Sequence, residues 1–448
     1  MNSIWIKNPL AIYTNGEMDA NGGVVVADKK IIELVRDGSV PTHQYNVIFD
    51  AKDHVLLPGL INTHHHFYQT LTRAVPAACN KELFDWLKIL YTIWAKLTPA
   101  HIEISCRLAL AELLLSGCTT ASDHHYVFPA GLEQAIDLQV TEAEKLGMRI
   151  ALTRGSMSLS VEDGGLPPES VVQSDEVILA DSERLIKKYH QHEQGAMRQI
   201  ILAPCSPFSV SESLMTETAH LAEKFGVQLH THLAETKDET GYCLDLFGVR
   251  PVDYLERVGW LKNNVWLAHG IQFEPDEIGK LGAAGVGICH CPSSNMVLAS
   301  GICPTLDLEA AGCPVGLGVD GSASNDCSNL MQEIRQALLL QRLRYGAKRV
   351  SHLDALRWAT RGSARCIGRD DIGEIAPGMQ ADLALFKLDE LRFSGSGDPL
   401  AALVLCGAHR ADQVMVAGRW VVEKGEIPGM DMELLMEKHS NLAEQLLR

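Results

Sequence analysis

The sequence predicts an α/β protein: a (β/α)₈ TIM-type barrel with a small β-sandwich domain formed from both ends of the chain. In the middle of the chain, short apolar segments alternate with longer amphipathic segments, as expected for parallel strands joined by helices. Both ends are instead rich in short β-prone runs separated by Gly and Asn. These two sequence patterns divide the chain into residues 1–58, 59–365 and 366–448, with the barrel in the central part.

The two ends of the chain are expected to form one β domain together. Residues 1–58 contain runs such as SIWIKN and GGVVVADKKIIELV, and no helix is expected among them. Residues 371–388 and 411–428 return to the same Gly-punctuated pattern, which favours pairing with the N-terminal strands. Met432 to Leu447 is expected to form a terminal helix.

The central part contains eight candidate strands and the helices between them. The strand sequences are VLLPGLIN, CTTASDHH, RIALTRG, QIILAPCS, VQLHTHLAE, VWLAHG, GVGICHCP and CPVGLGVD. The helical sequences are IEISCRLALAELLL, LEQAIDLQVTEAEKLG, SERLIKKYHQHEQ, ESLMTETAHLAEKFG, EPDEIGKLGAAG and NLMQEIRQALLLQRL. The connection from Met157 to Asp175, rich in Gly, Pro and Ser, follows the third strand. It is expected either to cover the active-site face as a lid or to form a mobile surface loop.

Composition indicates a soluble globular protein that acts on a small molecule. The chain has 448 residues, 46% of them hydrophobic, and no apolar run of the length that spans a membrane. The N-terminus lacks a secretory pattern, and the 12 cysteines include no paired CxxC, so a cytoplasmic protein without disulfides is expected. The net charge of −17 argues against nucleic acid as a partner. The absence of GxxxxGK[ST], of a dinucleotide fingerprint and of HExxH excludes nucleotide hydrolysis, hydride transfer and zincin proteolysis.

The stretch LPGLINTHHHFYQTLTR, residues 57–73, carries the strongest chemical signal. Three consecutive histidines stand where an apolar strand stops and a loop begins. Side chains alternate along a strand, so His64 and His66 share one side while His65 points to the other. Neutral imidazoles are favoured ligands of Zn²⁺, and barrels carry their active sites at the carboxyl ends of the strands.

Other strand ends carry matching groups. The fifth strand ends in HTHLAET, which puts His230 and His232 on one face and Glu235 just behind them. Either histidine could be a third ligand, and the carboxylate could transfer protons. The sixth strand ends at His269 and the eighth at Asp320. A single buried histidine is usually only hydrogen-bonded, but a whole set at strand ends favours a metal site.

These motifs resemble a known family. LPGLINTHHHFYQTLTR, HLAET, AHG, CHCPSSNMVLASGICP, LGVDGSASND and GEIAPGMQADLALF are similar to the amidohydrolase superfamily, in its branch of cytosine-, guanine- and adenosine-type aminohydrolases. The resemblance covers essentially the whole chain. It implies metal ligation by His64, His66, His232 and Asp320, proton transfer by Glu235, and a hydrogen bond from His269 to the metal-bound water.

The resemblance also bears on the metal and the reaction. Binuclear members carry a carboxylated Lys at the end of strand four, where this chain has Cys205 in QIILAPCSPFS. We therefore expect one divalent ion, Zn²⁺ with Fe²⁺ as the alternative. Activated water, with proton transfer by Glu235, His269 and Asp320, predicts hydrolytic deamination of an amino-substituted heterocycle.

The substrate expectation rests on finer similarities. HHHFYQTLTRA, GCTTASDHHYVFP and APCSPFSVS resemble most the deaminases that convert 8-oxoguanine to uric acid and ammonia. Gln69 could bind a ring edge as in guanine deaminases, Cys205 replaces an Arg of those enzymes, and Arg154 is a third candidate for substrate binding. Guanine, isocytosine, pterin and triazine hydrolases remain alternatives, and a non-catalytic binding barrel is a remote one. Whether identical chains associate is left open.

Overall fold

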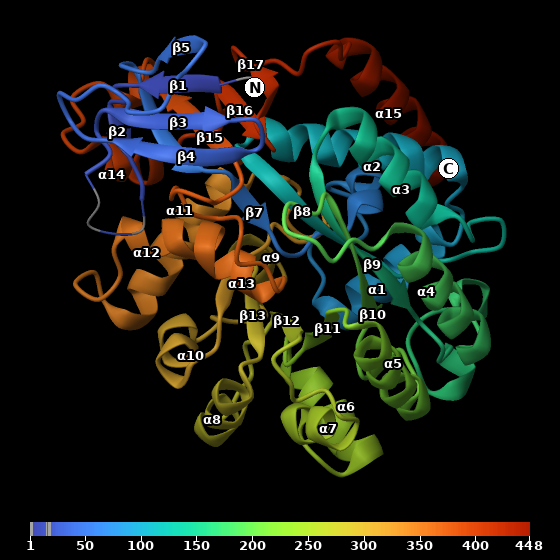
Figure 1. Cartoon of the computed structure of the whole chain (residues 1–448). Coiled ribbons are helices and arrows are strands. Elements are labelled where there is room, and N and C mark those ends of the chain that lie inside the picture. The colour runs from blue at the N-terminus through green and yellow to red at the C-terminus, as the bar shows by residue number, and fades with distance from the viewer. Residues whose placement is uncertain (1–2, 15, 17–18) are drawn as a thin grey trace.

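The computed structural model describes residues 3–14, 16 and 19–448, and its centre is a barrel of eight parallel strands. The strands follow one another around the barrel in sequence order (Figure 1). They are β7 (Leu60–Asn62), β8 (Cys118–His125), β9 (Arg149–Ser156), β10 (Arg198–Pro204), β11 (Leu229–Leu233), β12 (Val265–His269), β13 (Gly287–His290) and β14 (Val315–Leu317). This arrangement confirms the predicted fold class.

The first and last strands meet and bring the barrel close to closure. The backbone N–H of Thr63 donates to the carbonyl of Leu317 at 3.0 Å. One step further along, the N–H of Asp320 donates to the carbonyl of His64, also at 3.0 Å. The segment after β7 and the segment after β14 are therefore held side by side at the same end of the barrel.

Helices surround the barrel and connect its strands (Figure 1). The α-helices from the first to the eighth are α1 (Leu83–Trp94), α2 (Pro99–Leu115), α3 (Ala135–Leu146), α4 (Asp175–Tyr189), α5 (Glu212–Phe225), α6 (Lys237–Phe247), α7 (Pro251–Arg257) and α8 (Pro275–Ala284). The later ones are α9 (Pro292–Val297), α10 (Thr305–Ala311), α11 (Leu330–Tyr345), α12 (His352–Arg357), α13 (Ser363–Cys366), α14 (Pro399–Leu405) and α15 (Met432–Leu447). Short 3₁₀ turns are η1 (Phe67–Thr72), η2 (Val161–Asp163), η3 (Glu169–Val171) and η5 (Leu391–Phe393), and a π-helical turn, η4, spans Trp358–Gly362.

Two further sheets are built from the ends of the chain. One has the order β4-β3-β1-β5, with β1 (Ser3–Lys7), β3 (Gly23–Ala27), β4 (Lys30–Val35) and β5 (Val47–Asp50). The other, β17-β16-β15-β6-β2, joins β2 (Ala11–Ile12) and β6 (His54–Pro58) to β15 (Leu383–Lys387), β16 (Gln413–Val416) and β17 (Arg419–Glu423). Blue and red strands accordingly lie together in Figure 1. Side chains of both sheets share one buried apolar cluster, which includes Ile6, Val24, Leu56, Leu383 and Met415.

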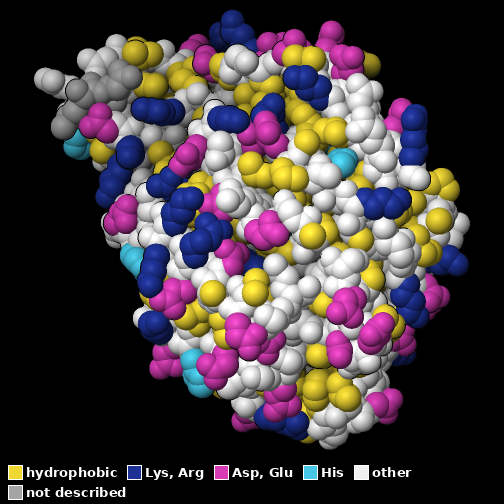
Figure 2. Space-filling model, turned by 90° about the vertical axis from the view of Figure 1, so that its right-hand side faces the viewer, with side chains coloured by type: hydrophobic (Ala, Val, Ile, Leu, Met, Phe, Trp, Pro, Cys, Tyr) yellow, Lys and Arg dark blue, Asp and Glu magenta, His cyan; other side chains and the backbone are white. Residues whose placement is uncertain are grey.

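The surface is of mixed charge. On the face shown in Figure 2, Lys and Arg side chains are interspersed with Asp and Glu. Among the described residues, no helix combines the length and the apolar character that crossing a membrane requires.

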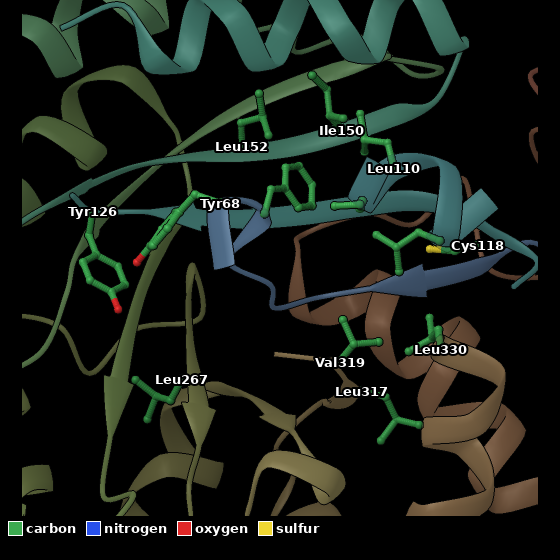
Figure 3. Packing of buried hydrophobic residues seen from close by; sticks show 14 of the residues in the cluster. Tyr68, Leu110, Cys118, Tyr126, Ile150, Leu152, Leu267, Leu317, Val319 and Leu330 are labelled. Carbon is green, nitrogen blue, oxygen red and sulfur yellow. The ribbon is translucent and has the colours of Figure 1, made fainter. Parts of the chain in front are cut away.

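The barrel strands bury both faces, which explains their nearly continuous apolar sequences. Ile150 and Leu152 of β9 belong to the large cluster between barrel and helices, together with Leu110 of α2 (Figure 3). The intervening Ala151 belongs to a separate cluster with Trp266 and other inward-facing residues. Alternate side chains of each strand therefore face the barrel interior. Towards the carboxyl ends of the strands, some of these interior side chains are polar.

Several details differ from the sequence-based expectations, among them the first barrel strand and two helices. The run VLLPGLIN forms not one strand but two, β6 and β7, which belong to different sheets and are separated at Gly59. A Cβ at Gly59 would lie 2.1 Å from Thr119 Oγ1, so the crossing needs glycine. Helix α4 begins at Asp175, capped by Ser174, and ends at Tyr189, earlier at both ends than the predicted segment. Helix α1, between η1 and α2, was not predicted.

Candidate active site

Three strand ends share an uncommon backbone conformation. Ala234, His269 and Asp320 have φ angles of 53°, 72° and 62°, in the left-handed region that residues other than glycine rarely adopt. They lie at or just beyond the ends of β11, β12 and β14. Such strain persists only where the surroundings enforce it, and it concentrates at functional sites.

Three histidines at this end of the barrel present unprotonated nitrogens to one another. His66 Nδ1 lies 2.7 Å from the carbonyl of His124, and His232 Nδ1 lies 2.6 Å from the carbonyl of Cys205. A carbonyl only accepts, so each Nδ1 carries the proton and each Nε2 keeps a lone pair. Burial lowers the pKa of His232 to about 3, which keeps that ring neutral.

The third histidine, His64, also has its lone pair at Nε2, because its Nδ1 donates to another histidine, His230. His230 Nδ1 lies 2.9 Å from the carbonyl of Trp266, so it donates there, and His230 Nε2 is an acceptor. His64 Nδ1, 2.8 Å away from that acceptor, must donate to it. The lone pair of His64 is therefore at Nε2, a buried atom without a hydrogen-bond partner among the described residues. His230 supports His64, and this separates the roles of His230 and His232.

The distances among these groups fit a divalent ion. His66 Nε2 lies 3.3 Å from His232 Nε2, and Asp320 Oδ1 lies 3.3 Å from both His64 Nε2 and His66 Nε2. Ligands about 2.0–2.1 Å from a tetrahedral zinc ion stand roughly 3.3–3.4 Å apart. Three lone pairs and a carboxylate are thus gathered without a proton between them, an arrangement that a cation stabilises.

A second trio of imidazoles is less suited to an ion. His64, His124 and His230 also have nitrogens close together. However, His64 and His230 already share a hydrogen bond, and His124 Nε2 faces the carbonyl of Ala203 at 2.9 Å. The set of His64, His66, His232 and Asp320 is therefore the better candidate.

A second carboxylate, Glu235, stands beside this group. Glu235 Oε2 lies 3.5 Å from His269 Nε2, which lies 3.9 Å from Asp320 Oδ2. Burial raises the pKa of Glu235; His269 opposes this effect and Asp320 adds to it. His269 Nδ1 lies 3.0 Å from Asn295 Oδ1, which orients the ring. The side chains of Glu235, His269 and Asp320 therefore lie in a row.

The turn that carries Glu235 is stabilised by hydrogen bonds to helix α6. The carboxylate of Glu239 on α6 accepts from the N–H groups of Ala234 and Glu235, at 2.8 and 2.9 Å. These bonds account for the left-handed conformation of Ala234. Ser300 Oγ lies 3.4 Å from Glu235 Oε1, and neither Ser300 nor Glu239 was predicted.

His66, His232, Glu235, His269 and Asp320 line one cavity. Gln69 and Cys205, both predicted to bind substrate, line it. Gln69 Oε1 is buried and receives no hydrogen bond from a described residue. The complete lining consists of His66, Gln69, Leu83, Trp86, Leu87, Tyr91, Tyr126, Cys205, Phe208, His232, Glu235, His269, Leu298, Asp320 and Ser324.

Comparison with known proteins agrees with this arrangement. The model of the Amidohydrolase family matches residues 55–421.

The chain belongs to the amidohydrolase family.

Individual relatives of this amidohydrolase extend over its full length. It is 63% identical, over 100% of both chains, to the 8-oxoguanine deaminase of Pseudomonas aeruginosa. It is 34% identical to an isoxanthopterin deaminase from an unknown prokaryotic organism, over 100% of this chain and 98% of that one. A crystal structure of atrazine chlorohydrolase from Arthrobacter aurescens TC1, complexed with zinc, is 32% identical with a TM-score of 0.91, over 99% of this chain and 100% of that one.

The structure does not bring Arg154 of this amidohydrolase into the cavity. Its guanidinium is fully buried, 2.6 Å from Asp181 Oδ2 and 2.7 Å from Gln173 Oε1, and it stacks on Phe128. Through these contacts Arg154 binds α4 and the connection before it. Its expected part in substrate binding is therefore not supported by its position.

The connection 157–175 of this amidohydrolase does not cover the described cavity. None of its residues is part of the lining. Ser158 and Leu159 donate to the carbonyl of Ser209, and Gln173 donates to the carbonyl of Met157. The cavity is covered instead by Leu83, Trp86, Leu87 and Tyr91 of α1, at the spacing of one helical face. That spacing is the signal in the sequence that could have revealed the helix.

Proposed function

We propose that this chain is a metal-dependent deaminase that hydrolyses 8-oxoguanine to uric acid and ammonia. The observation that carries the proposal is a full-length relative, 63% identical and named 8-oxoguanine deaminase, combined with a cavity that gathers the groups such a reaction requires. Water adds to the ring carbon that bears the amino group, and that amine leaves as ammonia.

In this proposal His64, His66, His232 and Asp320 hold one divalent ion, with Zn²⁺ as the first candidate. When bound, such an ion lowers the pKa of water and supplies a nucleophile at neutral pH. His230 keeps the lone pair of His64 at Nε2, and the carbonyls of His124 and Cys205 do the same for His66 and His232. Partners of this kind orient imidazole ligands and raise their affinity for metal.

The row Glu235–His269–Asp320 moves the protons. Glu235, whose pKa is raised by burial, donates a proton to the ring nitrogen next to the amino-bearing carbon. Asp320 and His269 accept and orient the proton of the attacking water. The Glu235 carboxylate then takes the second proton of the added water and delivers it to the amine, which leaves as ammonia. The first water proton, held by Asp320 and His269, finally restores the Glu235 carboxyl.

Substrate recognition is assigned to Gln69 and Cys205. Gln69 Oε1 offers an acceptor, and the amide nitrogen of the same side chain offers donors to the edge of a purine. Cys205 is small and weakly polar. It leaves space for the altered imidazole edge of 8-oxoguanine, which has N7–H and a C8 carbonyl where guanine has a bare N7 acceptor.

The test is a kinetic comparison of 8-oxoguanine with guanine, isoxanthopterin, isocytosine and an aminotriazine, with the Zn²⁺-loaded protein. Ammonia release and uric acid formation are measured together. We expect kcat/KM for 8-oxoguanine to exceed that for guanine at least about 10-fold, or about 1.4 kcal/mol. Equal values, or faster turnover of another heterocycle, would refute the substrate assignment but not the deaminase mechanism. Absence of ammonia release from every compound would refute both.

A further inference from the structure

The last helix of the chain contacts the turn that carries Gln69. Helix α15 packs on α2, on η1 and on α1. In Figure 1 it lies at the edge of the barrel, beside α2. Leu435, His439 and Leu446 are its buried side chains, at the spacing of one helical face. A histidine thus occupies the middle of an apolar stripe, where a leucine would be expected.

His439 makes a specific contact within η1. Its Nε2 lies 3.1 Å from Thr70 Oγ1, the neighbour of Gln69 in sequence. Thr70 Oγ1 donates its own hydrogen to the carbonyl of Phe67 at 3.0 Å, so it can only accept from His439. Burial and the charge of Arg73 lower the pKa of His439 to about 4, so the ring is neutral with its proton at Nε2.

Further hydrogen bonds hold the same turn, some within it and others to neighbouring residues. The N–H of Gln69 donates to the carbonyl of His66 at 2.9 Å. Thr72 Oγ1 donates to the carbonyl of Gln69 at 3.2 Å and accepts from Trp94 Nε1 of α1, also at 3.2 Å. Hydrogen bonds to His66, to Trp94 of α1 and to His439 of α15 therefore hold the backbone around Gln69 in place.

We propose that His439 is a positioning residue for substrate binding: through Thr70 it holds η1 so that the Gln69 side chain points into the cavity. This inference rests on the proposed function of Gln69. His439 does not line the cavity, so it acts on substrate only through the turn. A buried turn that loses one of its few bonds gains freedom, and Gln69 then loses preorganisation for its ligand.

The test compares two pairs of variants of the full-length, Zn²⁺-loaded protein. His439→Leu removes the donor, whereas His439→Gln keeps an N–H near the position of Nε2. Thr70→Val removes the acceptor, whereas Thr70→Ser keeps it. We expect His439→Leu and Thr70→Val to raise KM for 8-oxoguanine about 5-fold each, with kcat within about 2-fold and metal content unchanged. His439→Gln and Thr70→Ser should stay within about 2-fold of the parent KM. The double variant His439→Leu/Thr70→Val should be no worse than either single variant, because both remove the same bond.

A control separates positioning from general loss of stability. Leu446→Ala removes buried apolar surface from the same helix without touching the bond to Thr70. It should lower Tm with little change in KM. If Leu446→Ala raises KM as much as His439→Leu at an equal loss of Tm, or if His439→Leu keeps the parent KM, the proposal is wrong.

A readout without turnover distinguishes this inference from the proposed function. Hydrogen exchange of peptides that contain residues 67–72 should speed up in His439→Leu but not in His439→Gln. If exchange is faster in His439→Leu but the parent protein deaminates no purine, the His439–Thr70 contact holds the turn but has no role in substrate binding. Unchanged exchange would overturn the inference whatever the substrate.

Discussion

At the scale of single residues, Glu235 is the group whose environment most clearly matches a chemical task. It is buried beside His269, and burial raises its pKa. We predict that Glu235→Gln keeps its metal but loses about 10²–10⁴-fold in kcat, because the amide preserves shape but cannot transfer the proton. Metal content and kcat are measured on the same sample.

A matched control for this variant is Glu277→Gln. Glu277 is also buried, but it pairs with Arg250 at 2.9 Å and does not line the cavity. The control should keep parental kcat per folded molecule. Near-parental kcat in Glu235→Gln itself would end the assignment of Glu235 as proton donor.

Gly321 controls the position of Gln69. A Cβ at Gly321 would lie 1.8 Å from Gln69 Oε1, while its backbone conformation is open to alanine. We predict that Gly321→Ala displaces the Gln69 amide and raises KM for 8-oxoguanine about 10-fold, a loss of about 1.4 kcal/mol in binding, with metal still bound. Gly241→Ala, where a Cβ meets nothing within 4 Å, is the control. An unchanged KM in Gly321→Ala would argue that Gln69 does not contact substrate.

The sequence predicted that the candidate site residues lie at strand ends, as they do in the structure, but strand periodicity could not assign a role to each histidine. Strand periodicity puts His230 and His232 on the same face, and only the carbonyls that each Nδ1 meets distinguish support from ligand. The sequence also could not show that Arg154 lies outside the lining of the cavity. Its partner Asp181 is 27 residues away on α4, and nothing near Arg154 in the sequence shows that pairing.

At the scale of elements, the barrel strands were predictable because their apolar runs are bounded by polar residues. The error at VLLPGLIN has a physical origin: the run is continuously apolar, and both halves are fully buried. Only the pairing partners separate them, since β6 pairs with β15 and β7 pairs with β8. Helix α1 lies within a β-to-α connection that the sequence analysis left without an element, and it supplies four residues of the cavity lining.

The connection between β4 and β5 depends on one carboxylate. Glu33 accepts from the N–H groups of Thr42 and His43, both at 2.8 Å. Its slight burial acts to raise its pKa, but these bonds outweigh it and lower the pKa from 4.5 to about 2. A lowered pKa gives stability that is present above pH 4.5 and is lost as the pH falls through about 2.

We predict that Glu33→Gln is less stable than the parent above pH 4.5 and that the difference shrinks towards pH 2. Chemical denaturation of both proteins over this pH series measures the difference, in which contributions shared by both cancel. Glu437→Gln, an exposed position on α15, is the comparison. A difference between parent and Glu33→Gln that is independent of pH would contradict the role of these bonds.

At the scale of the whole molecule, the metal-binding group connects strands from opposite ends of the barrel sequence. His64 follows β7, His232 lies on β11 and Asp320 follows β14, so an ion would link the first, fifth and eighth strands. We predict about one tightly bound divalent ion per chain. We also predict a Tm that falls on chelation and recovers when Zn²⁺ is added, because a ligand that binds only the folded state stabilises it.

Metal analysis and thermal melting on the same preparation test this. The variant His66→Ala, which removes one donor, should show a much smaller shift of Tm with added Zn²⁺. Two tightly bound ions in the active protein would contradict the mononuclear site, as would a Tm shift in His66→Ala equal to that of the parent.

The mixed origin of the sheet β17-β16-β15-β6-β2 has a consequence for how the protein is made. Strand β6, at residues 54–58, leaves the ribosome about 325 residues before its partner β15, at residues 383–387. At roughly 5–20 residues per second, the nascent strand waits about 16–65 s with its hydrogen-bonding edge open. All five of its residues are buried in the finished protein. During synthesis this short segment therefore lacks the strand that covers this edge until β15 has been made, and a chain that ends before residue 383 leaves the edge open.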